Sequence, residues 1–161
     1  MNDTAIILLD NTVLSNFASI QRPDLVLLAL GNSAATVEEV LDELEVGVNS
    51  KAIPQVNWSW LATVAMTENE RAVYQDLLRK INKGEAACLA VAAGRGGRVM
   101  TDDRDARKIA VELQIPISGT IGILIRLVDL GRLTILDADE FLSEMIERGY
   151  FSPIRSLTEI L

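Results

Sequence analysis

The chain contains no histidine and a single cysteine, Cys88, among its 161 residues. Without histidine, Ser-His-Asp and Cys-His catalysis are excluded, and so are histidine-ligated zinc sites. Any bound metal ion must therefore be held by oxygen ligands, which favours Mg²⁺ or Mn²⁺ over zinc or copper. One cysteine also excludes an internal disulfide, so we expect an inert core thiol and a cytoplasmic protein.

Aromatic residues and long apolar runs are also scarce. Aromatics make up 4% of the chain against 49% for all apolar residues, so the core is expected to be aliphatic. A membrane span needs about 18 apolar residues, and Arg126 and Asp129 interrupt the best candidate, residues 121–130. No basic segment precedes an apolar stretch near the start, so we expect neither a secretory signal nor a membrane partner. Length and apolar content predict one folded domain over residues 1–161.

The chain has 15 basic residues against 23 acidic ones, and its net charge of −8 at first opposes a nucleic-acid partner. Their distribution is uneven, because residues 79–108 hold 8 of the 15 basic residues and only 4 acidic ones. Two interpretations stand side by side: a solvated helix face, or a phosphate-binding surface around an acidic site. In the second, Arg104, Arg107 and Lys108 are the candidates for nucleic-acid binding.

Carboxylates follow two predicted strands. The apolar run 5–9 leads into Asp10, and the strand 98–101 leads into the acidic segment 102–105. Continuous apolar runs predict parallel strands that are covered on both faces. Because the carboxyl ends of parallel strands meet at one edge of a sheet, we expect these acids to share one pocket. Helix capping is the other role open to such residues, and it does not exclude the first.

Short apolar strands alternate with helical patterns along the rest of the chain. Further strands are expected at 34–35, within 58–66, at 115–118 and at 150–154. Helices are expected at 13–18, 36–46, 68–81, 85–91, 103–113, 120–131, 137–147 and 156–161, with Thr12 and Thr36 as N-caps. This alternation predicts an α/β fold, a three-layer α/β/α sandwich around a mainly parallel central sheet.

Four segments in this order resemble the motifs of the PIN domain, a family of small metal-dependent ribonucleases. They are L-L-D-N-T-V-L-S-N (8–16), V-L-D-E-L (40–44), G-E-A-A-C-L-A (84–90) and T-D-D-R-D-A-R (101–107). The segment S-G-T-I-G-I-L (118–124), with the L-G-R-L-T that follows, is similar to a toxin-like prokaryotic subgroup. The resemblance covers nearly the whole chain.

The resemblance implies a set of site residues. Its catalytic acids and metal ligands would be Asp10, Glu43, Glu85 and Asp103, with Asp102 and Asp105 assisting the metal and Thr12, Asn16 and Thr101 supporting the acids. Helical position leaves two interpretations of Glu43: an acid at the edge of the buried face that points inward, or, as periodicity alone favours, one exposed acid of a charged helix. Glu85 is, by position, an ordinary partner of the helix dipole. Glu85 also departs from the family, where this position is often aspartate.

The implied activity is that of a ribonuclease dependent on Mg²⁺ or Mn²⁺. Metal-activated water would attack phosphodiesters of single-stranded or structured RNA. Family membership further implies a toxin with a small antitoxin partner, and a homodimer, for which the apolar C-terminal residues from Phe151 to Leu161 are candidate contacts. The alternative is a catalytically silent PIN-like module that binds or regulates, which Glu85 and the acidic surface favour.

Three other families share parts of the pattern, and each fails on a residue. Residues 10–13 are similar to the haloacid-dehalogenase signature, but Thr12 replaces its second aspartate. The D-x-D at 103–105 is typical of topoisomerase–primase folds, which have glutamate after the first strand where this chain has Asp10. A receiver domain needs an acceptor aspartate in mid-chain, which is absent here.

Overall fold

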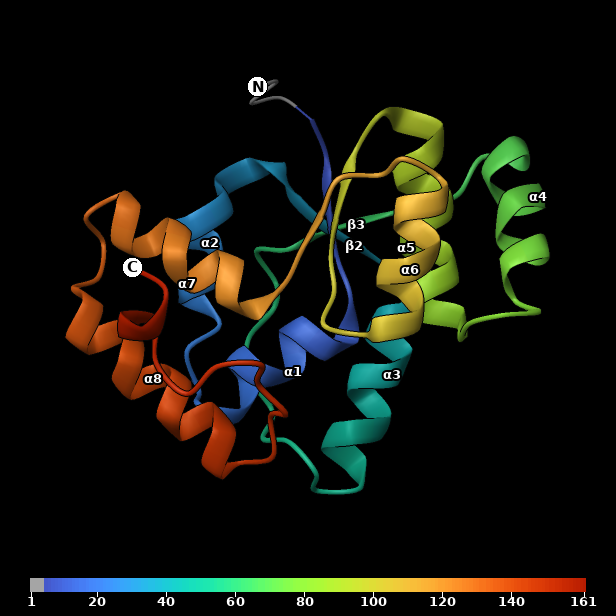
Figure 1. Cartoon of the computed structure of the whole chain (residues 1–161). Helices are drawn as coiled ribbons and strands as arrows, with labels where there is room; N and C mark the ends of the chain where they lie inside the picture. The colour runs from blue at the N-terminus through green and yellow to red at the C-terminus, as the bar shows by residue number, and fades with distance from the viewer. Residues whose placement is uncertain (1–4) are drawn as a thin grey trace.

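The computed structural model describes residues 5–161, in which five parallel strands form one sheet in the order β3-β2-β1-β4-β5 (Figure 1). The strands are β1 (Ile7–Leu9), β2 (Ala34–Val37), β3 (Ala62–Val64), β4 (Arg98–Met100) and β5 (Ile117–Ser118). Leu8, Leu9 and Val99 are completely or almost completely buried, as expected for central strands covered on both faces. The predicted three-layer α/β/α fold is confirmed, and its sheet is entirely parallel.

Helices cover both faces of the sheet (Figure 1). They are α1 (Asn11–Ser19), α2 (Asp24–Leu30), α3 (Glu38–Asn49), α4 (Glu68–Leu77), α5 (Lys83–Arg95), α6 (Arg104–Glu112), α7 (Thr120–Asp129) and α8 (Ile135–Glu147), with two short 3₁₀ helices, η1 (Gly31–Ser33) and η2 (Leu157–Glu159). Helices α3, α4 and α6 pack on α5, whereas α7 packs on α2 and α8. Helix α1 starts at the carboxyl end of β1 and contacts both α3 and α8.

Helix α5 is the central helix of one layer, and its segment 84–92 is buried throughout. This segment is rich in alanine, which lets α3 and α4 approach closely. The thiol of Cys88 is fully buried there, 3.8 Å from the carbonyl oxygen of Leu9. Burial raises the pKa of the Cys88 thiol well above its usual value, which agrees with the predicted inert core residue.

Four predicted helix starts are wrong. Helix α8 begins at Ile135 rather than at residue 137, because the Thr134 side chain caps it. Helix α1 begins one residue before Thr12, with Asp10 at its N-cap position. Thr36 lies within β2, where its hydroxyl donates to the carbonyl of Leu9 at 2.8 Å. Helix α5 begins at Lys83 rather than Glu85, because the Asn82 side chain caps it. A polar side chain thus sets the start of α5 and of α8, whereas no side chain caps α1 or α3.

The predicted strand at 150–154 is also wrong, because this segment is irregular and joins no strand. Its apolar side chains Tyr150 and Ile154 pack on the core from outside the sheet. The expected terminal helix is reduced to η2, which buries Leu157 completely. Leu157 is therefore a core residue rather than a contact between subunits.

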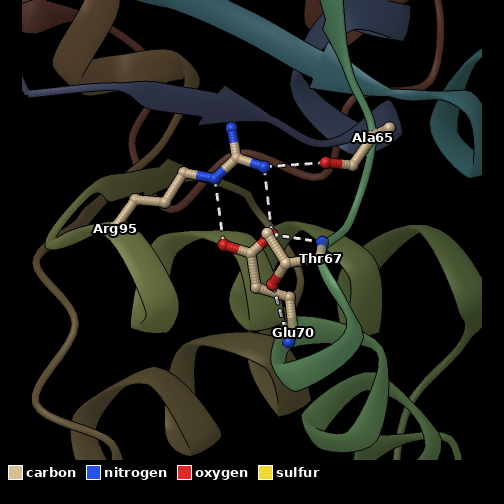
Figure 2. Close-up of polar contacts among 4 residues, drawn as sticks. All are labelled: Ala65, Thr67, Glu70 and Arg95. Carbon is tan, nitrogen blue, oxygen red and sulfur yellow. Dashed lines mark hydrogen bonds and ion pairs between the residues drawn. The ribbon is translucent and has the colours of Figure 1, made fainter.

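An ion pair between a buried carboxylate and a partly exposed guanidinium fixes α4 to the end of α5 (Figure 2). Glu70, only 4% exposed, accepts from Arg95 Nε at 2.9 Å and from a terminal nitrogen of the same guanidinium at 3.0 Å. That terminal nitrogen also donates to the carbonyl of Ala65 at 2.7 Å, and Glu70 forms a capping box with Thr67. Arg95, one of the basic residues of the 79–108 segment, is thus engaged within the protein.

No helix within residues 5–161 is long and apolar enough to cross a membrane.

Candidate active site

Asp10 lies at the carboxyl end of β1 and is 1% exposed. Its Oδ2 atom accepts from the hydroxyls of Thr101 at 2.8 Å and Thr12 at 2.9 Å. Its Oδ1 atom is buried and has no hydrogen-bond partner, and the side chain does not cap α1. Burial raises the pKa of Asp10, although both hydroxyls oppose the shift. A buried carboxylate with one oxygen left unsatisfied is costly unless another group compensates for it.

Glu43 reaches the same region from α3. Its Oε1 atom is also buried without a hydrogen-bond partner. The pKa of Glu43 is raised to about 7, first by burial and then by the charge of Asp10, whereas the backbone of Gly84 lowers it. Gly84 leaves the necessary space, since a Cβ atom there would overlap Glu43 Oε1. Glu43 is therefore turned toward the start of α5 and toward Asp10.

Glu85 lies in the first turn of α5 and is 5% exposed. Its Oε1 atom accepts from Asn82 Nδ2 at 2.9 Å, and its own backbone N–H donates to Asn82 Oδ1 at 3.0 Å. Burial raises the pKa of Glu85 to about 8, and the charges of Asp10, Asp103 and Glu43 add to the rise in that order. Glu85 is thus within electrostatic range of the three other acids.

Asp103 joins the group through Thr101. The Thr101 hydroxyl donates to Asp10 and accepts from the backbone N–H of Asp103 at 3.1 Å, so one side chain links the ends of β1 and β4. Asp103 also caps α6, where its Oδ2 atom accepts from Ala106 N–H at 2.9 Å. Four acids from four separate segments therefore surround the carboxyl ends of β1 and β4.

Asp102 and Asp105, the two other acids predicted to assist the metal, do not join this group. Both oxygens of Asp102 accept from Thr120, Oδ1 from its N–H at 3.0 Å and Oδ2 from its hydroxyl at 2.5 Å. Asn16 Nδ2 also donates to Asp102 Oδ2 at 3.2 Å. Asp105 is exposed on α6, beside Lys108 and Lys80 in a separate surface hollow. The carboxylate of Asp102 therefore joins β4 to α7, and Asp105 faces solvent.

The predicted supporting residues divide in the same way. Thr12 and Thr101 contact Asp10 directly, and the Thr12 hydroxyl also accepts from the backbone N–H of Asp102 at 2.9 Å. Asn16 instead bonds Asp102 and Thr120, the latter at 3.0 Å. Two hydroxyls thus hold Asp10, whereas Asn16 holds the connection to α7.

The three residues predicted to bind nucleic acid do not all lie on the same surface. Arg104 and Arg107 line a groove next to Asp102, and Arg107 also donates to the Thr101 carbonyl at 2.8 Å. Lys108 lies in the separate hollow beside Asp105. Two of the three cations therefore face the same side of α6 as the groove.

Two residues that shape the site were missed by the sequence analysis. Asn82, which caps α5, also donates to the Glu85 carboxylate and so orients it, and Gly84 leaves space for the Glu43 side chain. Asn82 was detectable, because Asn followed by Glu three residues later is typical of a helix start. No local signal indicates the role of Gly84, since it depends on a side chain about 40 residues earlier in the chain.

The donors of this group suit a hard divalent cation. All four are carboxylates, and two of their buried oxygens, on Asp10 and Glu43, lack any hydrogen-bond partner. Within residues 5–161, however, no three acidic or cysteine side chains are already arranged to hold a metal ion. The residues fit such an ion in chemistry, and their side chains must draw closer together to ligate it.

An all-parallel sheet with acids at the carboxyl ends of its strands places the chain among α/β proteins that bind ligands at that edge. A family model described as a PIN domain matches residues 6–161, and the chain belongs to this family. No curated protein and no solved structure matches it. PIN domains are generally nucleases and typically use divalent metal ions, so the chain has a nuclease-type fold.

Proposed function

We propose that this PIN domain is a divalent-metal-dependent endoribonuclease whose metal ligands are Asp10, Glu43, Glu85 and Asp103. The observation that carries the proposal is the pair of buried carboxylate oxygens without partners, Asp10 Oδ1 and Glu43 Oε1. The pKa of Glu43, raised to about 7, and that of Glu85, raised to about 8, add support, since burial and the charges of neighbouring acids cause both shifts.

Electrostatics explains why such a group favours a cation. Two ionised carboxylates about 5 Å apart repel by about 3 kcal/mol at an effective dielectric of about 20. Repulsion among four of them approaches the whole stability of a typical domain, roughly 5–15 kcal/mol. Protons relieve the repulsion in part, as the raised pKa values of Glu43 and Glu85 indicate. Mg²⁺ or Mn²⁺ would relieve it more completely at neutral pH.

Each residue then has a defined task. A bound divalent ion supplies Lewis acidity toward water and phosphate oxygens. Thr12 and Thr101 fix the orientation of Asp10, so that its Oδ1 atom stays available. Asn82 fixes Glu85 in the same manner. Arg104, exposed and next to Asp103, is positioned to contact phosphates of the substrate.

The wider role is proposed from the family resemblance. We propose that residues 1–161 act as one nuclease unit and as a toxin of the toxin-like subgroup, with RNA as substrate and a small antitoxin protein as partner. A homodimer and a cytoplasmic location belong to the same proposal. The exposed apolar residues Phe151, Ile160 and Leu161 remain available for contacts between molecules.

A second candidate is a catalytically silent module that binds RNA or protein. It is favoured by one observation, that no three acids within residues 5–161 are already arranged around a common ion position. It predicts that the domain binds its partner whether or not the four acids are intact.

RNA cleavage separates the two candidates. Purified protein is incubated with mixed single-stranded and structured RNAs in Mn²⁺, in Mg²⁺ and in EDTA. Asp10→Asn and Asp103→Asn variants are compared with Asp105→Asn, a matched change at an exposed acid of α6. The enzyme proposal predicts metal-dependent cleavage by the wild type and Asp105→Asn only. Cleavage of equal rate in all four proteins would indicate contamination and contradict the proposal.

A further inference from the structure

A groove of about 850 Å³ opens beside the acidic group. Its lining includes Arg104 and Arg107 of α6, Ile121 and Ile125 of α7, and the C-terminal residues Tyr150, Phe151 and Pro153, and Asp102 and the end of β5 complete it. We call it the Arg104–Phe151 groove. Because Arg104 directly follows Asp103, the groove begins at the edge of the proposed active site.

Phe151 is the most exposed large apolar residue of the described chain, at 96%. The backbone that carries it is fixed nonetheless. The N–H of the preceding residue, Tyr150, donates to the carbonyl of Met145 at 2.9 Å, and the Tyr150 hydroxyl donates to Asp102 at 3.5 Å. The hydrogen bonds of Tyr150 thus anchor the chain next to Phe151, whose ring faces solvent at the groove in a chain with very few aromatic residues.

The groove is cationic, although the chain as a whole is acidic. Arg104 makes no ion pair or hydrogen bond with any residue in the 5–161 part of the chain. Arg107 uses one terminal nitrogen for the Thr101 carbonyl and is otherwise exposed. The only acid in the lining, Asp102, is engaged by donors from Thr120 and Asn16. Burial raises the pKa of Asp102 and the charge of Arg107 opposes this shift, so Arg107 also acts on Asp102, and Arg104 carries the unpaired positive charge of this surface.

We infer that the Arg104–Phe151 groove binds one unpaired nucleotide of single-stranded RNA, with the base stacked on Phe151 and a phosphate on Arg104. Aromatic rings accept any base face, and guanidinium groups accept phosphate in a planar arrangement. A duplex does not fit this mode, because its bases present no free face to a ring. This inference rests on the proposed function and specifies its substrate as single-stranded.

Oligonucleotide binding tests the groove independently of cleavage. Fluorescence anisotropy is measured in EDTA, in the Asp10→Asn background, with a labelled 12-nucleotide RNA as single strand and as duplex. Phe151→Ala and Arg104→Gln should each weaken single-strand binding about tenfold, and Phe151→Trp should retain it. Leu136→Ala, at an exposed apolar residue of α8, and Arg71→Gln, on α4, should change nothing.

The possible outcomes distinguish a failure of the groove assignment from a failure of the proposed ribonuclease activity. Unchanged affinity in Phe151→Ala, or equal affinity for the duplex, would overturn the groove assignment even if the protein cleaves RNA. The same holds if Phe151→Ala alters only the oligomeric state in size-exclusion chromatography, because Phe151 would then serve a protein contact. Binding that depends on Phe151 and Arg104 in a protein that cleaves no RNA would support the groove and contradict the proposed enzyme.

Discussion

Gly84 leaves the space that the carboxylate of Glu43 occupies: a Cβ atom at position 84 would overlap Glu43 Oε1 and lie 3.0 Å from its Cδ. This contact joins the middle of α3 to the first turn of α5, one residue before Glu85. The position of Glu43, one of the proposed ligands, therefore depends on the absence of a side chain at position 84.

Gly84→Ala should weaken Mn²⁺ binding by about tenfold or more, because Glu43 has to leave its position, and a loss of 1.4 kcal/mol corresponds to tenfold. Helix propensity alone favours alanine by up to about 1 kcal/mol, so little stability should be lost. Calorimetric titration and thermal unfolding measure the two effects. In a Glu43→Ala background the same change should cost no further affinity. Full Mn²⁺ affinity in the single variant would refute the argument.

The raised pKa values of Glu43 and Glu85 make stability depend on pH. The folded state binds more protons than the unfolded state between the usual pKa of 4.5 and the folded values of about 7 and about 8. Stability without metal should therefore fall as pH rises through this window. Glu85→Gln should remove part of the fall and raise the melting temperature at pH 8.5 by about 2–4 °C per kcal/mol recovered.

Thermal unfolding in EDTA at several pH values tests this prediction. Wild type and Glu85→Gln should melt at similar temperatures near pH 4.5 and diverge above it. A wild type that gains stability relative to the variant as pH rises would show that Glu85 is paired with a cation.

The ion pair between Glu70 and Arg95 should stabilise the fold without affecting the site (Figure 2). Glu70→Gln should lower the free energy of unfolding by about 1.5–3 kcal/mol, the usual contribution of charged hydrogen bonds. Arg95 also lowers the pKa of Glu70, so this stabilisation is present above the usual pKa of glutamate and is lost in acid. Urea unfolding at pH 7 checks the first effect. An unchanged midpoint, or a loss of metal binding, would contradict this role.

Asp102 should be a positioning residue for α7. Asp102→Ala removes the acceptor of the Thr120 N–H and of the Thr120 hydroxyl, and one of the two acceptors of the Asn16 amide, which should cost about 1–3 kcal/mol of stability. Mn²⁺ affinity should change far less than in Asp103→Asn, where stability should be nearly kept. Unfolding and titration of both variants measure this contrast. The reverse pattern would make Asp102 the ligand.

The fold class and the acids at the strand ends could be predicted from the sequence, because both depend on local pattern. Continuous apolar runs followed by acids correctly placed Asp10 after β1 and Asp103 after β4. Glu43 and Glu85 were assigned to the site by the family resemblance. Periodicity alone favoured an exposed acid for Glu43, although its place beside Leu44 left an inward orientation open, and it described Glu85 as a partner of the helix dipole. Their burial arises from packing between α3 and α5, which no local window contains.

The misses have the same origin. The two oxygens of Asp102 are taken by Asn16 and Thr120, which are distant in sequence. The segment 150–154 contains two aromatic residues and an isoleucine, types common in strands, yet it packs against the core from outside the sheet. Arg95 was counted in the basic segment that could bind nucleic acid, but it forms an ion pair with Glu70. Long-range partners decided each case.

Direct titration with Mn²⁺ at pH 7.5 tests the central claim most closely, because it needs no substrate. The account predicts one or more binding events in the wild type and in Asp105→Asn. It also predicts at least a tenfold loss of affinity in Asp10→Asn and in Glu43→Gln, the two residues with unpartnered buried oxygens. Equal Mn²⁺ affinity in all four proteins, or no binding by the wild type, would contradict it.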